Sequence, residues 1–352
     1  MDDPEIASLA FDSLLRLSLI EGFTAAHLCR MFAPPSAAPR LPGIPTRGKG
    51  SLLSRAEAAL SSAETGCAAD AVREACARSG VAIVSWLSEE YPLALREIPD
   101  PPLVLYRVGV PWSNGRGVAV VGSRAPTGPG KNFARILAAD LAGSGCVVVS
   151  GMARGIDAAA HRGALDAGGA TVAVLGCGPD VVYPPEHAGL RAEIAAKGTL
   201  FSEYPPGSLP LAHRFPARNR IVSGLCRAVV VAEAPERSGA LITARLALEQ
   251  GREVMAVPGN PWFAHTAGSN RLLREGAAPA CSAADVIDAL GGLPPSGGLQ
   301  ARILGALDRV RHAGEIASAL AVGMPELLPA LLEMELANLV VKRTGDYYKR
   351  KS

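Results

Sequence analysis

The feature that most constrains the fold of this chain is a repeated pattern of short, β-branched apolar runs, most of which end in glycine. Each run is separated from the next by an alanine-rich segment of helical character. Apolar runs without strict alternation are typical of parallel strands that are buried on both faces. The pattern therefore predicts an α/β fold with a doubly wound parallel sheet. The runs are GVAVVGSR (117–124), CVVVSGMARG (146–155), TVAVLGCG (171–178), CRAVVVAEA (226–234) and EVMAVPGN (253–260).

The regions that flank these runs differ in composition. Residues 4–31 and 53–78 are rich in Ala, Leu and spaced charges, which predicts helices, whereas the Pro- and Gly-rich residues 33–50 exclude one. After a linker-like stretch come three helical segments and a candidate hairpin, as in a winged helix. We expect a helical domain over 1–85, the α/β domain over 86–290, a linker over 291–299 and a winged-helix-like domain over 300–352.

Composition and charge narrow the function classes. The 352 residues carry 35 basic and 33 acidic side chains, a net charge of +2, so binding to nucleic acid must depend on local clusters of cations. The seven cysteines are scattered without metal-ligand spacing, which predicts reduced thiols and no metal site. Because the sequence lacks a long apolar run and starts with acidic residues, we expect a cytoplasmic protein with no membrane contact.

Three predicted loops between strand and helix combine small residues with an arginine. Such loops lie at the carboxyl ends of parallel strands, where helix N-termini and close backbone approach favour an anion. Taken singly, each is also explained as a tight turn, but three together predict a phosphate-binding edge. The sequence lacks GxGxxG and GxxxxGK[ST] patterns, so we expect no nucleotide cofactor. The residues are Gly122, Ser123 and Arg124; Ser150, Gly151, Arg154 and Gly155; and Ser238 and Gly239 beside Arg237.

The segment HRFPARNR, residues 213–220, gathers cations around one aromatic residue just before the run at 226–234. Arg214, Arg218 and Arg220 are suited to phosphates, Phe215 to stacking on a base, and Asn219 to a base edge or to holding the loop. The alternative is a basic loop with a core phenylalanine, whose arginines pair with Glu203, Glu233 and Glu236. Proximity to the three glycine-containing loops favours nucleic acid.

Candidate catalytic groups are few. Asp157 and His161 are four residues apart and share a helix face, and Glu233 follows a strand. No nucleophile with a base, paired carboxylates or metal cluster accompanies them in the sequence. We therefore expect these three residues to organise loops, and we expect the protein not to be an enzyme.

Several long segments of the chain resemble a known protein family. The segments GSRAPTGPG, SGMARGIDAAAHRGAL, SEYPPGSLPLAHRFPARNRIVSGL and VVVAEAPERSGALITARLALEQGREVMAVPG resemble the bacterial DNA-processing protein A (DprA/Smf) family over residues 87–285. The resemblance implies an extended Rossmann-like domain that binds single-stranded DNA, protects incoming strands in natural transformation and loads the RecA recombinase. It also implies a homodimer through that domain, a SAM-like N-terminal domain and no cofactor or catalytic activity.

The resemblance also assigns roles to individual residues. The family's DNA pocket corresponds here to Arg124, to the loop with Ser150, Gly151, Arg154 and Gly155, and to Phe215, Arg218, Asn219 and Arg220. A lysine of the family pattern is missing before the phenylalanine, and we expect Arg214 to supply its charge. In the C-terminal domain the presumed recognition helix, residues 324–339, is acidic, so any DNA contact is expected through the wing. Contact with a protein, or a role in packing alone, is the alternative for this domain.

Two other functions are compatible with parts of the sequence. The first is a Rossmann-like nucleotide or nucleoside hydrolase with Glu233 as the acid, although the PGGxGTxxE loop of such enzymes has no counterpart here. The second is a scaffold that recruits the recombinase and touches DNA only secondarily, for which DNA binding would be weak and insensitive to salt.

Overall fold

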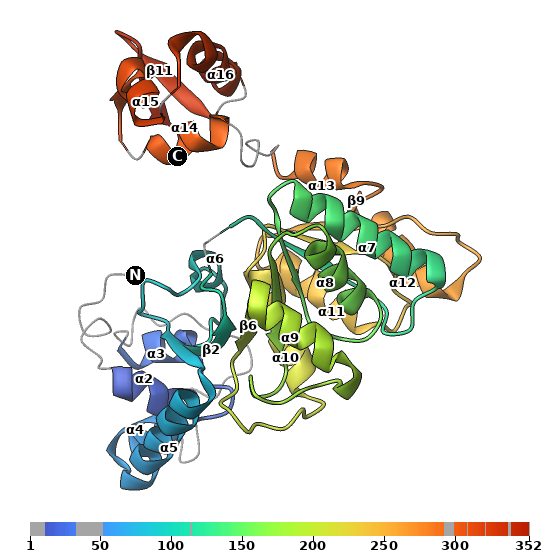
Figure 1. Ribbon diagram of the computed structural model, residues 1–352. Helices are drawn as coiled ribbons and strands as arrows, with labels where there is room; N and C mark the ends of the chain where they lie inside the picture. The colour runs from blue at the N-terminus through green and yellow to red at the C-terminus, as the bar shows by residue number, and fades with distance from the viewer. Residues whose placement is uncertain are drawn as a thin grey trace. The chain divides into compact units, whose positions relative to one another are not determined.

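The computed structural model describes residues 11–32, 52–112, 115–291, 299–307, 309–320, 322–336 and 339–351 (Figure 1). The chain divides into two compact units, Met1–Val286 and Ile287–Ser352, and each is described by itself. The predicted loop over 33–50 lies outside the described residues, as does the predicted linker apart from its two ends.

The first unit is built on a nine-stranded sheet with the order β1-β2-β6-β5-β4-β3-β7-β8-β9. The seven strands from β6 to β9 are parallel, while β2 pairs antiparallel with β6 and β1 antiparallel with β2. All five predicted runs form parallel strands, so the α/β prediction is confirmed. The strands are β1 (Ala82–Ser85), β2 (Val104–Gly109), β3 (Gly117–Val121), β4 (Val147–Ser150), β5 (Thr171–Leu175), β6 (Thr199–Ser202), β7 (Ala228–Val231), β8 (Glu253–Ala256) and β9 (Ala278–Pro279).

Helices cover both faces of this sheet. From β3 the chain proceeds strand by strand to β6, then returns to β7 on the other side of β3. Right-handed crossovers therefore place the helices before β6 on one face and those after it on the other. The crevice between β3 and β7 is the topological switch point, where ligands bind in open α/β sheets. The helices are α7 (Gly128–Gly143), α8 (Ile156–Asp166), α9 (Ala188–Lys197), α10 (Arg214–Gly224), α11 (Gly239–Glu249) and α12 (Ala267–Arg274). A further helix, α13 (Ala283–Ala289), spans the boundary between the two units.

The segment HRFPARNR differs from its prediction as a loop. It forms the start of α10, whose first turn contains Pro216. Proline is tolerated there because first-turn N–H groups have no partner within the helix. The helix turns about 100° per residue, so Arg218 and Arg220 point to different sides.

The N-terminal region is helical but more broken than predicted. The expected helix over 4–31 is interrupted at a turn where Gly22 has a φ of +80°, and residues 1–10 lie outside the described part. The helix expected over 53–78 breaks at Ser62, whose side chain caps the next helix by accepting from the Thr65 N–H. The helices are α2 (Phe11–Ser18), α3 (Ala25–Phe32), α4 (Leu52–Ser61), α5 (Ala63–Ser79) and α6 (Leu93–Arg96).

The second unit contains the expected three helices and terminal hairpin, together with one short additional strand. Its antiparallel sheet has the order β10-β12-β11, and Ile303, Ile316, Leu331 and Tyr348 are buried in its core. Among the described residues, no single helix is long and apolar enough to cross a membrane; α15 and α16 pass that test only as a pair bent by 116°. The elements are α14 (Leu299–Ala306), β10 (Arg311–His312), α15 (Ala313–Leu320), α16 (Met324–Leu336), β11 (Val340–Arg343) and β12 (Tyr347–Arg350).

Candidate nucleic-acid interface

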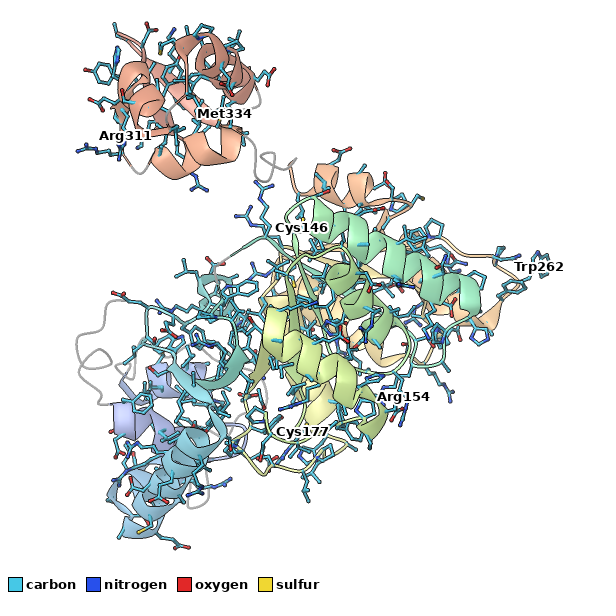
Figure 2. All side chains as sticks on the ribbon, viewed as in Figure 1. Cys146, Arg154, Cys177, Trp262, Arg311 and Met334 are labelled. Atoms are coloured by element: carbon cyan, nitrogen blue, oxygen red, sulfur yellow. The ribbon has the colours of Figure 1, made fainter. Side chains whose placement is uncertain are left out.

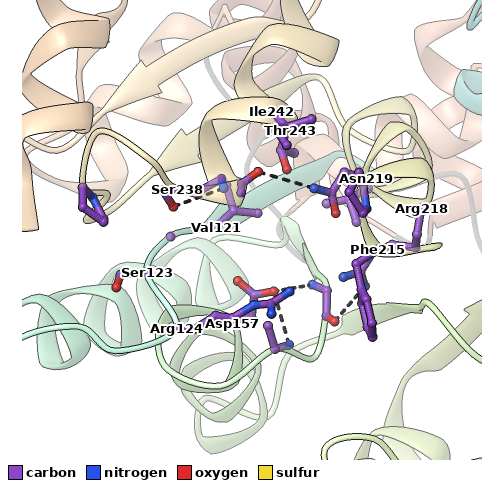
Figure 3. A pocket seen from close by; sticks show the side chains of 18 of the residues that line it. Val121, Ser123, Arg124, Asp157, Phe215, Arg218, Asn219, Ser238, Ile242 and Thr243 are labelled. Atoms are coloured by element: carbon purple, nitrogen blue, oxygen red, sulfur yellow. Dashed lines mark hydrogen bonds between the residues drawn. The ribbon is translucent and has the colours of Figure 1, made fainter. Parts of the chain in front are cut away.

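A cavity of about 510 Å³ opens at the switch point between β3 and β7. The loops after β3, β4 and β7 and the N-terminal parts of α10 and α11 form its walls (Figure 3). The structure thus brings together residues that the sequence places more than a hundred positions apart. Of the predicted site, these residues line the cavity: Gly122, Ser123, Arg124, Gly151, Asp157, Phe215, Arg218, Asn219, Ser238 and Gly239.

Arg124 and Phe215 lie beside each other in the lining of this cavity. Arg124 is exposed, and its guanidinium carbon lies 5.5 Å from the centre of the Phe215 ring. The ring of Tyr183 lies 5.3 Å from Phe215. Gly176 permits this arrangement, because a Cβ there would come within 2.9 Å of the Phe215 ring. Sequence reasoning missed Tyr183, although it follows β5 at the same edge of the sheet.

Arg218 supports the floor of the cavity. Its side chain is buried, and Nη1 donates to the Gly151 carbonyl at 2.7 Å and to the Val174 carbonyl. Burial lowers its pKa, which the negative charge of Asp157 opposes. The predicted role of Arg218 as a phosphate contact therefore needs correction, because its charged head already binds the loop after β4.

Asp157 fixes the same loop from the other side. Its carboxylate accepts from the N–H groups of Gly151 at 3.1 Å and Ala153 at 3.3 Å. Burial raises its pKa, and the charge of Arg218 acts in the opposite direction. Gly151 is squeezed between these groups, since a Cβ there would lie 2.5 Å from an Arg218 nitrogen. The loop after β4 is thus held between Asp157 and Arg218, and the close packing at Gly151 restricts the movement of both side chains.

Three further predicted residues lie behind the cavity wall. Ser150 donates to the Val120 carbonyl at 2.7 Å. A Cβ at Gly155, whose φ is +77°, would lie 2.3 Å from the Ser123 carbonyl oxygen. His161 is buried with Nδ1 2.8 Å from the Thr171 hydroxyl, and burial lowers its pKa to about 3. These residues hold strands and loops together and do not face the cavity.

Glu233 connects the loops after β3 and β7. Its carboxylate accepts from the Thr127 N–H at 2.8 Å and from the Thr127 hydroxyl at 2.6 Å. Its backbone carbonyl accepts from the Ser123 N–H at 2.6 Å. Thr127 is also the N-cap of α7. Both carboxylate oxygens of Glu233 therefore hold the start of α7. Because this carboxylate is already engaged, the alternative function as a hydrolase with Glu233 as the acid is disfavoured.

Arg220 and Arg214 lie away from the cavity. Arg220 is buried in ion pairs with Glu203 at 2.6 Å and Asp100 at 2.9 Å, so the alternative of internal pairing holds for this residue. Arg214 donates to the Leu209 carbonyl at 2.9 Å, and its guanidinium lies 4.5 Å from the Tyr204 ring. The predicted phosphate contact of Arg220 is therefore wrong for this conformation, because its fork is fully occupied by carboxylates.

Arg154 does not line the main cavity. It pairs with Glu186 and lines a smaller apolar cavity that also includes Tyr183 and Phe215. The pair is exposed, so its net contribution to stability is small. Figure 2 shows Arg154 at the surface of the first unit.

The fold and the cavity together define a class of protein: a doubly wound α/β protein with an arginine-lined cavity at its switch point. Residues 82–291 match the model of the DNA recombination-mediator protein A family. The chain belongs to that family.

Individual relatives agree with this assignment. The chain is 41% identical to the DNA processing protein DprA of Bacillus subtilis over 60% of this chain and 72% of the relative. It is 46% identical to the Smf protein of a Synechocystis strain over 58% of this chain. The match spans about half the length of that relative, 53%.

Two solved structures are similar to this chain. The structure of DNA processing protein A from Streptococcus pneumoniae has a TM-score of 0.65 and 34% identity, covering 79% of this chain and 98% of that one. The second, from Helicobacter pylori, has a TM-score of 0.54 and 32% identity, covering 60% of this chain and 95% of that one. It was described for the single-stranded DNA binding mode of that protein.

Proposed function

We propose that this protein binds single-stranded DNA at the cavity between β3 and β7. The observation that supports this most directly is the charge of the cavity lining. Two exposed arginines, Arg124 and Arg237, line it, while the buried Arg218 holds its floor. Among the described lining residues the one acid is Asp157, which is buried. The phosphate backbone of a DNA strand in the cavity would therefore lie against cations and small-residue loops. No exposed carboxylate in the described lining would repel it.

The aromatic wall supports a single strand over a duplex. Phe215 stands beside Arg124 at the cavity mouth, and a base must be unstacked from its neighbours to lie on such a ring. Stacking of this kind contributes about 1–3 kcal/mol per base in single-strand binders. The Helicobacter pylori relative, whose single-stranded DNA binding mode is described, supports the same substrate.

The wider role follows from family membership. The protein would act in the cytoplasm as a homodimer through the Rossmann-like domain, protect incoming strands in natural transformation and load RecA onto them. Its second unit would be a winged-helix-like domain. Because α16 carries Glu326, Glu333 and Glu335 and no basic residue, that domain would touch DNA through the β11–β12 hairpin or serve another contact.

Fluorescence anisotropy of a labelled oligothymidine tests the proposal. Arg124→Ala should weaken binding about 10- to 150-fold, the loss of about 1.5–3 kcal/mol of charged hydrogen bonding. The salt slope should fall by about 0.7, the value for one phosphate on a single strand. Phe215→Ala should weaken binding to a similar extent without changing the slope, because it removes no cation.

Arg78→Ala is the matched control, since Arg78 is an exposed arginine on α5 that lies outside the cavity. It should bind as the wild type does, and an unlabelled duplex should compete poorly. The proposal is contradicted if the wild type does not bind, or if Arg124→Ala and Arg78→Ala behave alike.

A further inference from the structure

Two neighbouring aromatic residues of the first unit are exposed to solvent. Trp262 is 90% exposed and Phe263 is 55% exposed, whereas the other two tryptophans, Trp86 and Trp112, are buried. Figure 2 shows Trp262 at the tip of a loop that projects from the body of this unit. Large exposed apolar surface of this kind is typical of a binding site.

The loop that carries these residues is held in one conformation. The Asn260 side chain accepts from the Trp262 N–H at 3.0 Å, and the Asn260 carbonyl accepts from the Thr266 hydroxyl at 2.7 Å. Asn270 on α12 bonds to both the N–H and the carbonyl of Gly259, at 3.0 and 2.9 Å. The aromatic pair is therefore presented in advance of binding, so a ligand need not order the loop.

The position of the loop connects it to the cavity. It follows β8, which is the neighbour of β7, and the loop after β7 contributes Arg237, Ser238 and Gly239 to the cavity. Neighbouring strands lie about 4.8 Å apart, so the loops after β7 and β8 are adjacent along the same edge. A strand that leaves the cavity over Arg237 would meet this loop next.

The charge of the surrounding sequence suits a polyanion. Residues 254–274 contain no Asp or Glu and include His265, Arg271 and Arg274. Glu275 follows directly and pairs with Arg271 at 3.6 Å, so the cation that remains exposed here is Arg274. The exposed aromatic rings beside His265 and Arg274 favour nucleic acid, and a second copy of this chain is the competing occupant that the test distinguishes.

From these observations we infer that Trp262 and Phe263 form a second stacking platform for single-stranded DNA, beyond the cavity. The inference rests on the proposed function, since it extends the same strand along the edge of the sheet. The cavity holds a short part of a strand, and the platform would take bases further along it. Long oligonucleotides should therefore depend on the platform, and short ones should not.

The test uses the full chain and oligothymidines of about 4 and about 16 nucleotides, the range of site sizes in single-strand binders. Trp262→Ala should weaken the longer one about 5- to 150-fold, the loss of one stacked base. Its affinity for the shorter one and its salt slope should stay unchanged. Trp262→Phe should restore most of the affinity, and Leu93→Ala, which removes another exposed apolar side chain, should have no effect.

Tryptophan fluorescence gives an independent readout. The longer oligonucleotide should quench wild-type emission and leave Trp262→Phe emission unchanged, because Trp86 and Trp112 are buried. If the wild type binds both lengths and Trp262→Ala alters neither, the platform alone is overturned. It is also overturned if sedimentation shows that Trp262→Ala dissociates an oligomer and weakens both lengths equally. If the wild type binds neither length, the proposed function fails as well.

Discussion

The edge of the large sheet and the terminal hairpin of the second unit both carry cations, but the two regions place them differently. At the sheet edge, Arg218 is buried beneath a loop and Arg124 stands over an aromatic ring. In the hairpin, Lys342 pairs with Asp346 at 2.8 Å, and Lys349 and Arg350 are exposed. Both regions are rich in basic residues, but the arginines at the sheet edge also line a cavity.

This difference shows that an arginine near a site can act in two ways. Arg218 shapes the loop that a ligand would meet, and Arg124 is free to reach the ligand itself. The hairpin cations Lys349 and Arg350 instead lie exposed on the surface of the second unit. Substitutions in the two regions should therefore have effects of very different size.

The largest effect is expected for Arg218→Ala. It leaves Asp157 buried without its compensating charge and the Gly151 carbonyl without a donor, which should lower the free energy of unfolding by about 3–5 kcal/mol. Urea denaturation followed by circular dichroism measures this. Lys349→Ala in the hairpin should stay within about 0.5 kcal/mol of the wild type, and equal effects would remove the distinction between the regions.

A smaller loss is expected for Gly151→Ala. The added methyl group would meet the Arg218 guanidinium, and displacing that group should cost about 1–3 kcal/mol of stability. Gly128→Ala is the control, because nothing lies within 4 Å of its added Cβ. A thermal unfolding series resolves the two, and a tolerated Gly151→Ala would mean that the buried network is loose.

The interior behind the cavity should also make the first unit sensitive to acid. The pKa of His161 is about 3 in the folded protein, well below its ordinary value near 6.5. Between these values the unfolded chain binds a proton that the folded one does not, so stability falls as the pH falls. The slope is at most about 1.4 kcal/mol per pH unit.

The comparison of wild type with His161→Gln isolates this contribution, because other titrating groups are common to both. Denaturant midpoints measured from pH 7 to pH 4 should fall more steeply for the wild type. Parallel profiles would show that the histidine is not a source of acid sensitivity.

The smallest effect is expected from removing residues 300–352. If the hairpin cations take no part in binding single strands, affinity for oligothymidine should change by less than about twofold, within the effect of one weak exposed charge. Anisotropy titrations of the full and shortened chains measure this. A loss of tenfold or more would place part of the DNA site in the second unit.

Much of the fold was predictable because parallel strands buried on both faces have a distinct composition. All five predicted runs became strands of one sheet, while β1, β2, β6 and the two-residue β9 were missed. β6 has four residues, and β1 and β2 pair antiparallel at the end of the sheet, where the pattern of buried runs does not apply. The helix at HRFPARNR was missed because proline is usually read as a helix breaker.

The sequence predicted which loops form the site, but it did not predict which side chains within them are free to bind a ligand. Small residues after strands identified the cavity, because the carboxyl ends of parallel strands converge on one edge. Which arginine is free depends on its partners, and Arg220 meets Glu203 and Asp100 only after folding. Tyr183 carried no spacing signal, since its approach to Phe215 is set by the packing of the loop after β5 on α10.

The antiparallel pairing of β2 with β6 has a consequence for how this protein can be shortened. β6 is a fully buried strand, and β2 occupies the side of it that would otherwise be an open edge. A chain that started after residue 110 would present the unpaired backbone of β6 to other chains, which is a template for edge-to-edge aggregation. The N-terminal residues therefore protect the sheet from aggregation by covering the edge of β6. A chain without them should self-associate.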